Sequence, residues 1–274
     1  MKVPKDTYLA DFLTDKAVDF IRRNQASPFF LYLPHFAVHT PHQAKPELIA
    51  HFEHKAPVGG HVSPVYAAMI ASLDESVGRI LALLDQLKIA ENTLVIFASD
   101  NGGGEVTSNA PLRGGKQTLY EGGIRVPAMF RWPGRIAPGV SDVPITSVDF
   151  FPTFVELAGL KPPADVPLDG VSLVPLFDGK SIERDALFWH FPEYFGSPRD
   201  KVHSTPCGVI RSGPWKLLEF FEDGRLELYN LKDDIGETHN LAEKEPEQAN
   251  ELLKRLRAWR KGIHAPMPTV NHSK

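Results

Sequence analysis

Residues 93–127 read TLVIFASDNGGGEVTSNAPLRGGKQTLYEGGIRVP, and this stretch decides the fold of the chain. The apolar run from Leu94 to Ala98 has the length and composition of a strand that is buried on both faces. It stops at Ser99, Asp100 and Asn101, which three glycines follow. Ligands of open α/β sheets gather beyond the carboxyl ends of such strands. The stretch therefore predicts an α/β fold whose buried strand delivers polar groups to a site.

Patterns on both sides of this stretch extend the prediction to a mostly parallel central sheet that is flanked by helices. We expect a strand at 29–33, a long helix at 64–88 that begins at the cap Ser63, and a right-handed βαβ connection to the strand at 93–99. An earlier helix is expected to begin at Thr14. Further elements are expected as a strand at 126–131 and a helix at 147–158.

Beyond about residue 160 the pattern changes to short segments separated by proline and glycine. These segments predict a small antiparallel sheet with strands near 186–190, 208–211, 215–220 and 226–229, followed by a last helix from about Pro246. We therefore expect two domains, residues 1–160 as an α/β domain and residues 161–274 as a linker with a small α+β subdomain.

Composition excludes several functional classes. The net charge of −4, from 30 basic and 34 acidic residues, gives no general attraction to nucleic acid or to an anionic membrane. A single cysteine, Cys207, excludes an intrachain disulfide and a cysteine-based zinc cluster. The first residues lack the apolar core of a signal peptide, and no apolar run is long enough to span a bilayer. The compartment stays undecided.

Asp100 and Asn101 are the first candidate site residues. Their side-chain oxygens are hard ligands of the kind that Ca²⁺ and Mg²⁺ prefer, and the glycines after them let an ion approach the backbone. An Asx turn that closes the strand explains the same residues. Both interpretations stay open at this point.

Lys116 and three histidines are the remaining candidates. Glycines flank Lys116 as they would in an anion cradle, but the spacing of a nucleotide phosphate loop is absent, and a solvated lysine fits as well. His35, His39 and His42 follow the expected strand at 29–33. They could converge on zinc, or one of them could act as an acid, base or anion donor at the same sheet edge, or they could be ordinary loop residues.

Five blocks in order resemble the sulfatase family, in the arylsulfatase-like branch of the alkaline phosphatase superfamily. One such block would be weak evidence, whereas five in the family's order are specific. The small strands with Trp215-Lys216 and the segment around Glu237-Thr-His-Asn resemble the family's carboxy-terminal sheet. The five blocks are FFLYLPHFAVHTPH (29–42), SDNGG (99–103), LRGGKQTLYEGGIRVP (112–127), SVDFFPTFVELAG (147–159) and DGVSLVPL (169–176).

The resemblance implies a hydrolase of sulfate esters. In that function Asp100 and Asn101 would bind Ca²⁺ or Mg²⁺, Lys116 would bind the sulfate group, and His39 would contact the leaving ester oxygen, so that Lys116 and His39 are both catalytic and substrate-binding. A divalent cation and a lysine stabilise the anion, while an imidazolium donates to the oxygen that gains charge. Arg113 and Arg125 would support the site. The expected partner is a sulfated small molecule or a sulfated carbohydrate.

The chain departs from the family pattern in its first part. Family members carry there an Asp-Asp metal pair and a C-x-P-x-R or S-x-P-x-R segment, whose Cys or Ser becomes the nucleophile formylglycine. Neither pattern occurs in the first part of this chain, and its Asp233-Asp234 pair lies far from there, in a polar turn after the expected small sheet. We therefore expect the carboxy-terminal part of a sulfatase, with an unpaired sheet edge that could associate with a partner, and a longer parent that is periplasmic or secreted. Alternatives are a phosphoryl or phosphonate ester hydrolase of the same superfamily, or a noncatalytic binding module. Loops such as 193–205 do not identify the substrate.

Overall fold

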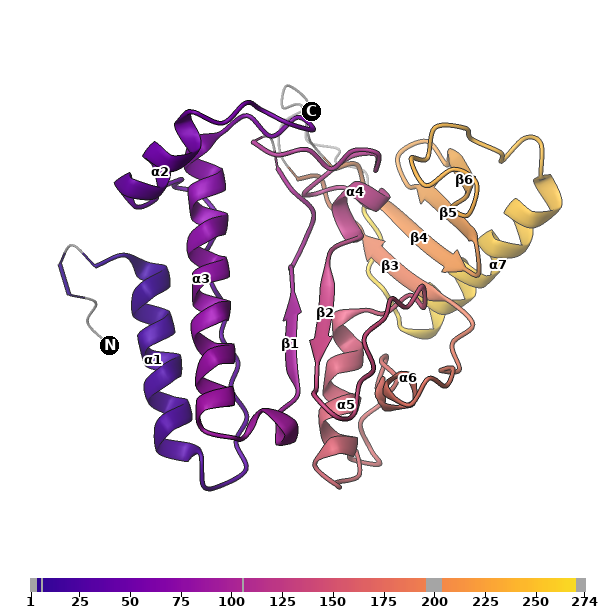
Figure 1. Cartoon of the computed structure of the whole chain (residues 1–274). Helices are drawn as coiled ribbons and strands as arrows, with labels where there is room; N and C mark the ends of the chain where they lie inside the picture. The colour runs from indigo at the N-terminus through magenta and orange to yellow at the C-terminus, as the bar shows by residue number, and fades with distance from the viewer. Residues whose placement is uncertain (1–3, 6, 105, 196–203, 270–274) are drawn as a thin grey trace. The chain divides into compact units, whose positions relative to one another are not determined.

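The computed structural model describes residues 4–5, 7–104, 106–195 and 204–269 (Figure 1). The chain forms two compact units. The first consists of Met1–Phe97 and Met129–Ala137, and the second of Ala98–Ala128 and Pro138–Lys274. These units are defined by the compactness of the structure and interleave along the chain, so they do not test the domain boundary expected near residue 160. That boundary stays a prediction.

Helices dominate the first unit. Its core lies where α1 and α3 pack side by side, around Ile21, Leu83, Leu84 and Ala90. The strand expected at 126–131 is confirmed as β2, which pairs with β1 in a two-stranded sheet. The elements are α1 (Leu9–Asn24), α2 (Pro46–Glu53), α3 (Pro64–Gln86), the 3₁₀ turn η1 (Ala90–Asn92), β1 (Val95–Ala98) and β2 (Ala128–Arg131).

The helix expected at 64–88 is confirmed, and the expected start of the helix before it is wrong. Ser63 caps α3 by accepting a hydrogen bond from the Tyr66 N–H, at 3.2 Å, and Pro64 stands in the first turn. Thr14, by contrast, lies inside α1 and not at its start. Its buried hydroxyl lies 2.6 Å from both the Ala10 carbonyl oxygen and the Ser76 hydroxyl of α3. The Thr14 hydroxyl therefore forms its hydrogen bonds within α1 and with α3, and it does not cap the first turn of a helix.

The strand expected at 29–33 is also wrong. The segment is extended and its side chains alternate, with Phe29 and Leu31 packed on the core and Phe30 and Tyr32 65% and 77% exposed. No strand ladder includes it in the part of the chain that the structure describes. An apolar alternation fixes an extended backbone, but a strand also needs a neighbour for its hydrogen bonds. The predicted βαβ connection is therefore not completed within the described residues.

A four-stranded antiparallel sheet organises the second unit, in the order β3-β4-β5-β6. Each of the four small strands and the last helix were expected from the sequence, and all are confirmed. The mixed α/β class with a small antiparallel sheet and a helix is likewise confirmed. The elements are β3 (Leu187–Phe191), β4 (Cys207–Ser212), β5 (Trp215–Phe220), β6 (Leu226–Asn230), α4 (Glu121–Ile124), the 3₁₀ turn η2 (Ser147–Asp149), α5 (Phe150–Leu157), α6 (Val174–Phe177) and α7 (Pro246–Gly262).

This sheet is covered on both faces. Successive side chains of a strand point to opposite faces, so Leu217 packs with the α7 residues Leu252 and Leu256, whereas Leu218 packs with Tyr120 on the other side. Figure 1 shows α7 running along the sheet. The face opposite α7 therefore meets the 99–127 loop, which carries three of the four predicted site residues.

Candidate functional site

The loop at 99–127 is closed by backbone hydrogen bonds within the second unit. The Lys116 N–H donates to the Gly103 carbonyl oxygen at 3.0 Å, and the Gly102 N–H donates to that of Gly123 at 2.9 Å. At its base the Ser99 N–H donates to the Pro127 carbonyl oxygen at 3.3 Å. The lysine backbone thus lies against the turn that follows Asp100 and Asn101, although 14 residues of chain separate Asn101 from Lys116.

Asn109 holds the interior of this loop. Its side-chain oxygen accepts from the Gly103 N–H at 2.9 Å, and its amide nitrogen donates to the carbonyl oxygens of Gly103 and Gly114, at 3.0 and 3.2 Å. One side chain therefore satisfies backbone groups on both the segment after Asp100 and the segment before Lys116. Sequence reasoning did not single out Asn109.

The glycines of the loop are required by close packing of backbone. A Cβ atom on Gly102 would lie 1.7 Å from the Gly122 carbonyl oxygen, and one on Gly123 would lie 2.0 Å from that of Thr118. Real Cβ atoms do not approach so closely, and backbone neighbours cannot move away cheaply. The glycines, which in the sequence suggested an anion-binding loop, thus allow the backbone segments of the 99–127 loop to pack in direct contact.

Asp100 and Asn101 have the donor chemistry of a hard-cation site, but they supply only part of one. Asp100 Oδ1 accepts the Asn101 N–H at 2.9 Å, and Asn101 Nδ2 donates to the Gly102 carbonyl oxygen at 3.0 Å. A cation would use the other carboxylate oxygen and the amide oxygen. Ca²⁺ and Mg²⁺ need at least six ligands, and no group of three His, Cys, Asp or Glu side chains suited to a metal occurs among the described residues. These two residues therefore fit as two ligands of a larger shell.

The three candidate histidines lie in the first unit and have different surroundings. His39 is exposed, with Nδ1 3.0 Å from the Thr40 carbonyl oxygen. His35 is half-buried, its Nε2 lies 3.0 Å from the Ser76 hydroxyl, and burial lowers its pKa. His42 packs edge-on against Tyr66. The predicted site residues are thus divided between the units, and the role of His39 beside Lys116 stays a prediction.

A buried charge cluster joins the 99–127 loop to the small sheet. Lys216 of β5 is fully buried, and its Nζ lies 2.9 Å from Glu121 Oε1 and 2.8 Å from Glu237 Oε1. Glu237 also accepts the Glu121 N–H at 2.6 Å. Arg125 and Arg211 approach the second oxygen of Glu121, at 3.6 and 3.9 Å. Because buried charges are tolerated only when paired, this cluster fixes α4, which begins five residues after Lys116.

Arg113 makes a second connection to the same sheet. Its guanidinium donates to the Tyr229 hydroxyl at 2.7 Å and to the Glu237 carbonyl oxygen at 3.1 Å, and it stacks 3.9 Å from the centre of the Tyr120 ring. The hydroxyls of Tyr120 and Tyr229 both donate to Glu227, at 2.8 and 2.7 Å. Burial and this carboxylate raise the pKa of both tyrosines. Arg113 therefore connects the loop to the sheet, and its expected support of a catalytic site stays a prediction.

Sequence reasoning missed the Lys216 cluster, although a signal for it was present. Lys216 lies within the run Trp215–Phe220, where alternation puts it on the same face as Leu218 and Phe220. A lysine on a face that is otherwise apolar implies a buried partner of opposite charge. Its two partners lie 95 and 21 residues away in the sequence, and nothing local identifies them.

A family model described as "Sulfatase" matches residues 2–160, which is more than half of the chain. A second one, "N-sulphoglucosamine sulphohydrolase, C-terminal", matches residues 115–262. Both matches include Lys116. No described helix has the length and apolar character needed to cross a membrane.

Similar proteins agree with these matches. A "Sulfatase" of Formosa agariphila is 39% identical over 94% of this chain and 51% of its own length. "Steryl-sulfatase" of Rattus norvegicus is 37% identical over 77% of this chain and 36% of its own length. The crystal structure of Ps i-CgsB in complex with k-i-k-neocarrahexaose superposes with a TM-score of 0.82 at 31% identity, over 94% of this chain and 56% of that one. This chain thus spans about half the length of the first relative and of the solved structure. On the family match, the chain belongs to the sulfatase family.

Proposed function

We propose that this chain supplies one part of the active site of a sulfate-ester hydrolase. Lys116 binds the sulfate group, Asp100 and Asn101 bind Ca²⁺ or Mg²⁺, and His39 assists departure of the ester oxygen. The observation that carries the proposal is the 3.0 Å hydrogen bond from the Lys116 N–H to the Gly103 carbonyl oxygen, because it joins the backbone of Lys116 to the turn that follows Asp100 and Asn101. Family membership supports the reaction type.

The chemistry of a sulfate ester matches these residue types. The substrate is an anion, and negative charge grows on the departing oxygen in the transition state, so a fixed lysine ammonium stabilises the sulfate oxygens. An imidazolium at His39 donates a proton to the departing alcohol. A bound divalent cation would add positive charge at the same sulfate oxygens. The close glycine contacts hold the backbone of Lys116 in place before substrate arrives, which lowers the cost of organising the site.

Ps i-CgsB was crystallised in complex with k-i-k-neocarrahexaose, which is a carbohydrate. We extend that class to this chain as part of the proposal. A sulfated carbohydrate presents the sulfate ester on a secondary or primary alcohol, so departure of the alkoxide needs a proton donor more than departure of an aryl oxide does. That need accounts for His39 in the proposed site.

Binding experiments on the chain test the first two assignments. Inorganic sulfate is titrated by calorimetry into the wild type, Lys116→Ala and the control Lys161→Ala, which removes an exposed lysine. We expect affinity to fall at least tenfold in Lys116→Ala only. Calcium is titrated into the wild type, Asp100→Asn and the exposed control Asp165→Asn, with a loss expected in Asp100→Asn only. Equal affinities in variant and control would overturn the respective assignment.

Activity is tested on a longer protein that contains this chain together with a nucleophile segment. Turnover of an aryl sulfate and of the matching aryl phosphate is compared, and sulfate is expected to be preferred. Lys116→Ala should lower kcat/KM by roughly 10²–10³, as loss of one oxyanion-stabilising group does elsewhere, and Lys161→Ala should not. A preference for the phosphate ester would establish the phosphoryl hydrolase in place of the sulfatase.

A further inference from the structure

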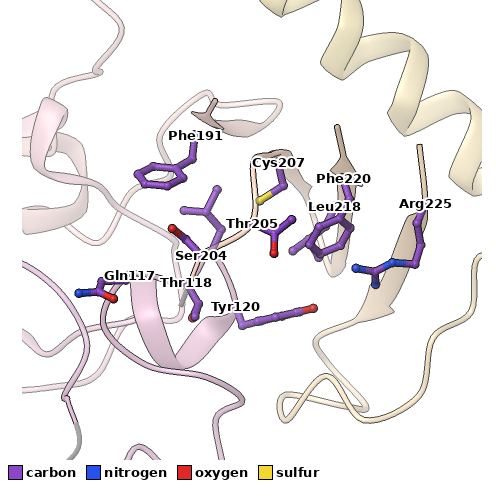
Figure 2. A pocket seen from close by; sticks show the side chains of 11 residues that line it. Gln117, Thr118, Tyr120, Phe191, Ser204, Thr205, Cys207, Leu218, Phe220 and Arg225 are labelled. Carbon is purple, nitrogen blue, oxygen red and sulfur yellow. The ribbon is translucent and has the colours of Figure 1, made fainter. Parts of the chain in front are cut away.

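A cavity of about 220 Å³ opens within the second unit, next to the residue that follows Lys116. Figure 2 shows the side chains around it, which come from the 117–120 segment and from the sheet strands. Phe191, Thr205 and Cys207 border the space on one side and Tyr120 lies below it. The functional assignments above make no use of this cavity.

The wall of the cavity continues the turn that carries Lys116. Gln117 lines the cavity and has a φ of 77°, in the left-handed region that non-glycine residues rarely adopt. Thr118 also lines it and locks the turn, because its hydroxyl donates to the Gly115 carbonyl oxygen at 2.8 Å and accepts the Gly115 N–H at 3.2 Å. Strain of this kind persists only where surrounding structure enforces it, and it is concentrated at ligand sites. The sulfate-binding residue and the cavity wall are therefore one rigid piece of backbone.

The charge in the lining of the cavity is already paired with carboxylates that lie outside the lining. Its one cationic group, Arg225, forms ion pairs with Glu227 and Asp223 and stacks 3.9 Å from the centre of the Phe220 ring. Burial raises the pKa of the Cys207 thiol to about 12, so the sulfur is neutral at physiological pH. An uncharged ligand group fits such a lining, since a charged one would lose hydration without gaining a partner.

The size and the polarity of the cavity further limit the classes of ligand that it can bind. A dry cavity of about 150 Å³ accepts benzene, and pockets for drug-sized ligands begin near 300 Å³, so this volume holds a single six-membered ring. Aromatic faces at Tyr120 and Phe191 are combined with hydroxyls at Ser204 and Thr205. A purely apolar ring would take water away from those hydroxyls without replacing it. A pyranose has an apolar C–H face for the aromatic rings and a rim of hydroxyls for the polar side chains.

We infer that this cavity binds one uncharged sugar ring, which is the alcohol part of the sulfate ester whose sulfate group Lys116 holds. The inference rests on the proposed function and adds to it the location of the leaving group. It assigns Phe191 and Thr205 as residues that determine specificity. The cavity then selects for the carbohydrate, while the 99–127 loop selects for the sulfate.

The test separates the two binding sites by probe and by variant. Saturation-transfer NMR on the full chain uses methyl β-galactopyranoside, benzyl alcohol and inorganic sulfate as separate probes. Thr205→Trp fills the cavity, Phe191→Ala removes a ring from its wall, and Phe151→Ala removes an exposed ring elsewhere in the same unit as a control. Lys116→Ala removes the proposed sulfate contact. Circular dichroism checks that each variant is folded.

We expect the galactoside to bind the wild type and Lys116→Ala with equal affinity. Its affinity should fall at least fivefold in Thr205→Trp and in Phe191→Ala, and should not change in the control Phe151→Ala. Sulfate should show the opposite dependence. If Thr205→Trp does not fold, Phe191→Ala decides the result. Stronger binding of benzyl alcohol than of the galactoside, or galactoside binding that survives both cavity variants, overturns the inference. Failure of sulfate to depend on Lys116 overturns the proposed function and leaves the sugar site intact.

Discussion

Replacement of Lys216 by methionine tests whether the buried charge cluster holds the 99–127 loop in place. Methionine keeps the length and most of the volume of the side chain while removing its charge. The change leaves Glu121 and Glu237, 1% and 0% exposed, without the ammonium that lies 2.9 and 2.8 Å from them. Removal of one partner from a buried ion pair costs about 3–5 kcal/mol, because the remaining charge is uncompensated.

The geometry places the expected cost near the lower end of that range. Arg125 and Arg211 still approach Glu121, at 3.6 and 3.9 Å, and Glu237 still accepts the Glu121 N–H. We therefore expect Lys216→Met to lower the free energy of unfolding by about 3 kcal/mol, which corresponds to a fall in Tm of roughly 6–12 °C for a unit of this size. The double variant with Glu237→Gln removes one uncompensated carboxylate and should recover at least 1 kcal/mol through coupling between neighbours.

Urea unfolding followed by tryptophan fluorescence measures this cost, because Trp189, Trp215 and Trp259 all lie in the second unit. The control is Lys180→Met, which removes an exposed lysine from that unit and should change stability by less than about 0.5 kcal/mol. Sulfate titration of Lys216→Met, under conditions where it remains folded, reports whether the loop has moved. A cost no larger than that of the control, with sulfate affinity unchanged, would refute the role given to the cluster.

Three further predictions concern the loop and the first unit. Gly102→Ala should abolish sulfate binding and lower Tm, because its Cβ would lie 1.7 Å from a carbonyl oxygen, whereas Gly104→Ala in the same loop meets nothing within 4 Å and should be tolerated in thermal melts and titrations. Asn109→Ala removes three hydrogen bonds to loop backbone and should cost about 2 kcal/mol in urea unfolding, with sulfate affinity reduced several-fold; unchanged values would contradict its role. Burial lowers the pKa of His35 below 6.5, so the folded state binds fewer protons there than the unfolded state: the stability that His35 contributes is complete above pH 6.5 and is lost as pH falls. His35→Gln should therefore flatten the dependence of Tm on pH between 7.5 and 5.0, and an unchanged slope would count against this.

Local patterns predicted most of the helices and all of the small antiparallel sheet. The start of α3 could be predicted from the cap Ser63 and Pro64 alone, and β5 could be predicted from the alternation within Trp215–Phe220. The prediction of a strand at 29–33 was wrong because alternation in one segment predicts only an extended backbone. A β-strand also needs hydrogen bonds to a second segment, and the sequence of 29–33 carries no information about that segment. Thr14 failed as a cap for a related reason, since its hydroxyl found Ser76, 62 residues away.

The candidate site was predictable where it depends on residue type and not where it depends on contacts at long range. Asp100, Asn101 and Lys116 are conspicuous because charged and amide groups stand among glycines at a strand end. Asn109 and Lys216 are inconspicuous in sequence, since what defines them is the backbone or carboxylate that each one meets. The cavity beside Gln117 is of the same kind, because it is formed by the 117–120 segment and by residues from 191 to 225, which lie at least 71 positions further along the chain.

Glu121 receives its two buried partners late during synthesis. Lys216 follows it by 95 residues and Glu237 by 116, and the chain grows from its amino end. Ribosomes add roughly 5–20 residues per second, so the carboxylate next to the glycine loop is without the Lys216 ammonium for about 5–19 seconds. The loop that carries Lys116 is therefore expected to close only after the last strand and the turn beyond it have left the ribosome. A nascent chain interrupted before residue 237 would keep this acidic group hydrated and the loop open, so closure of the loop follows synthesis of the small sheet.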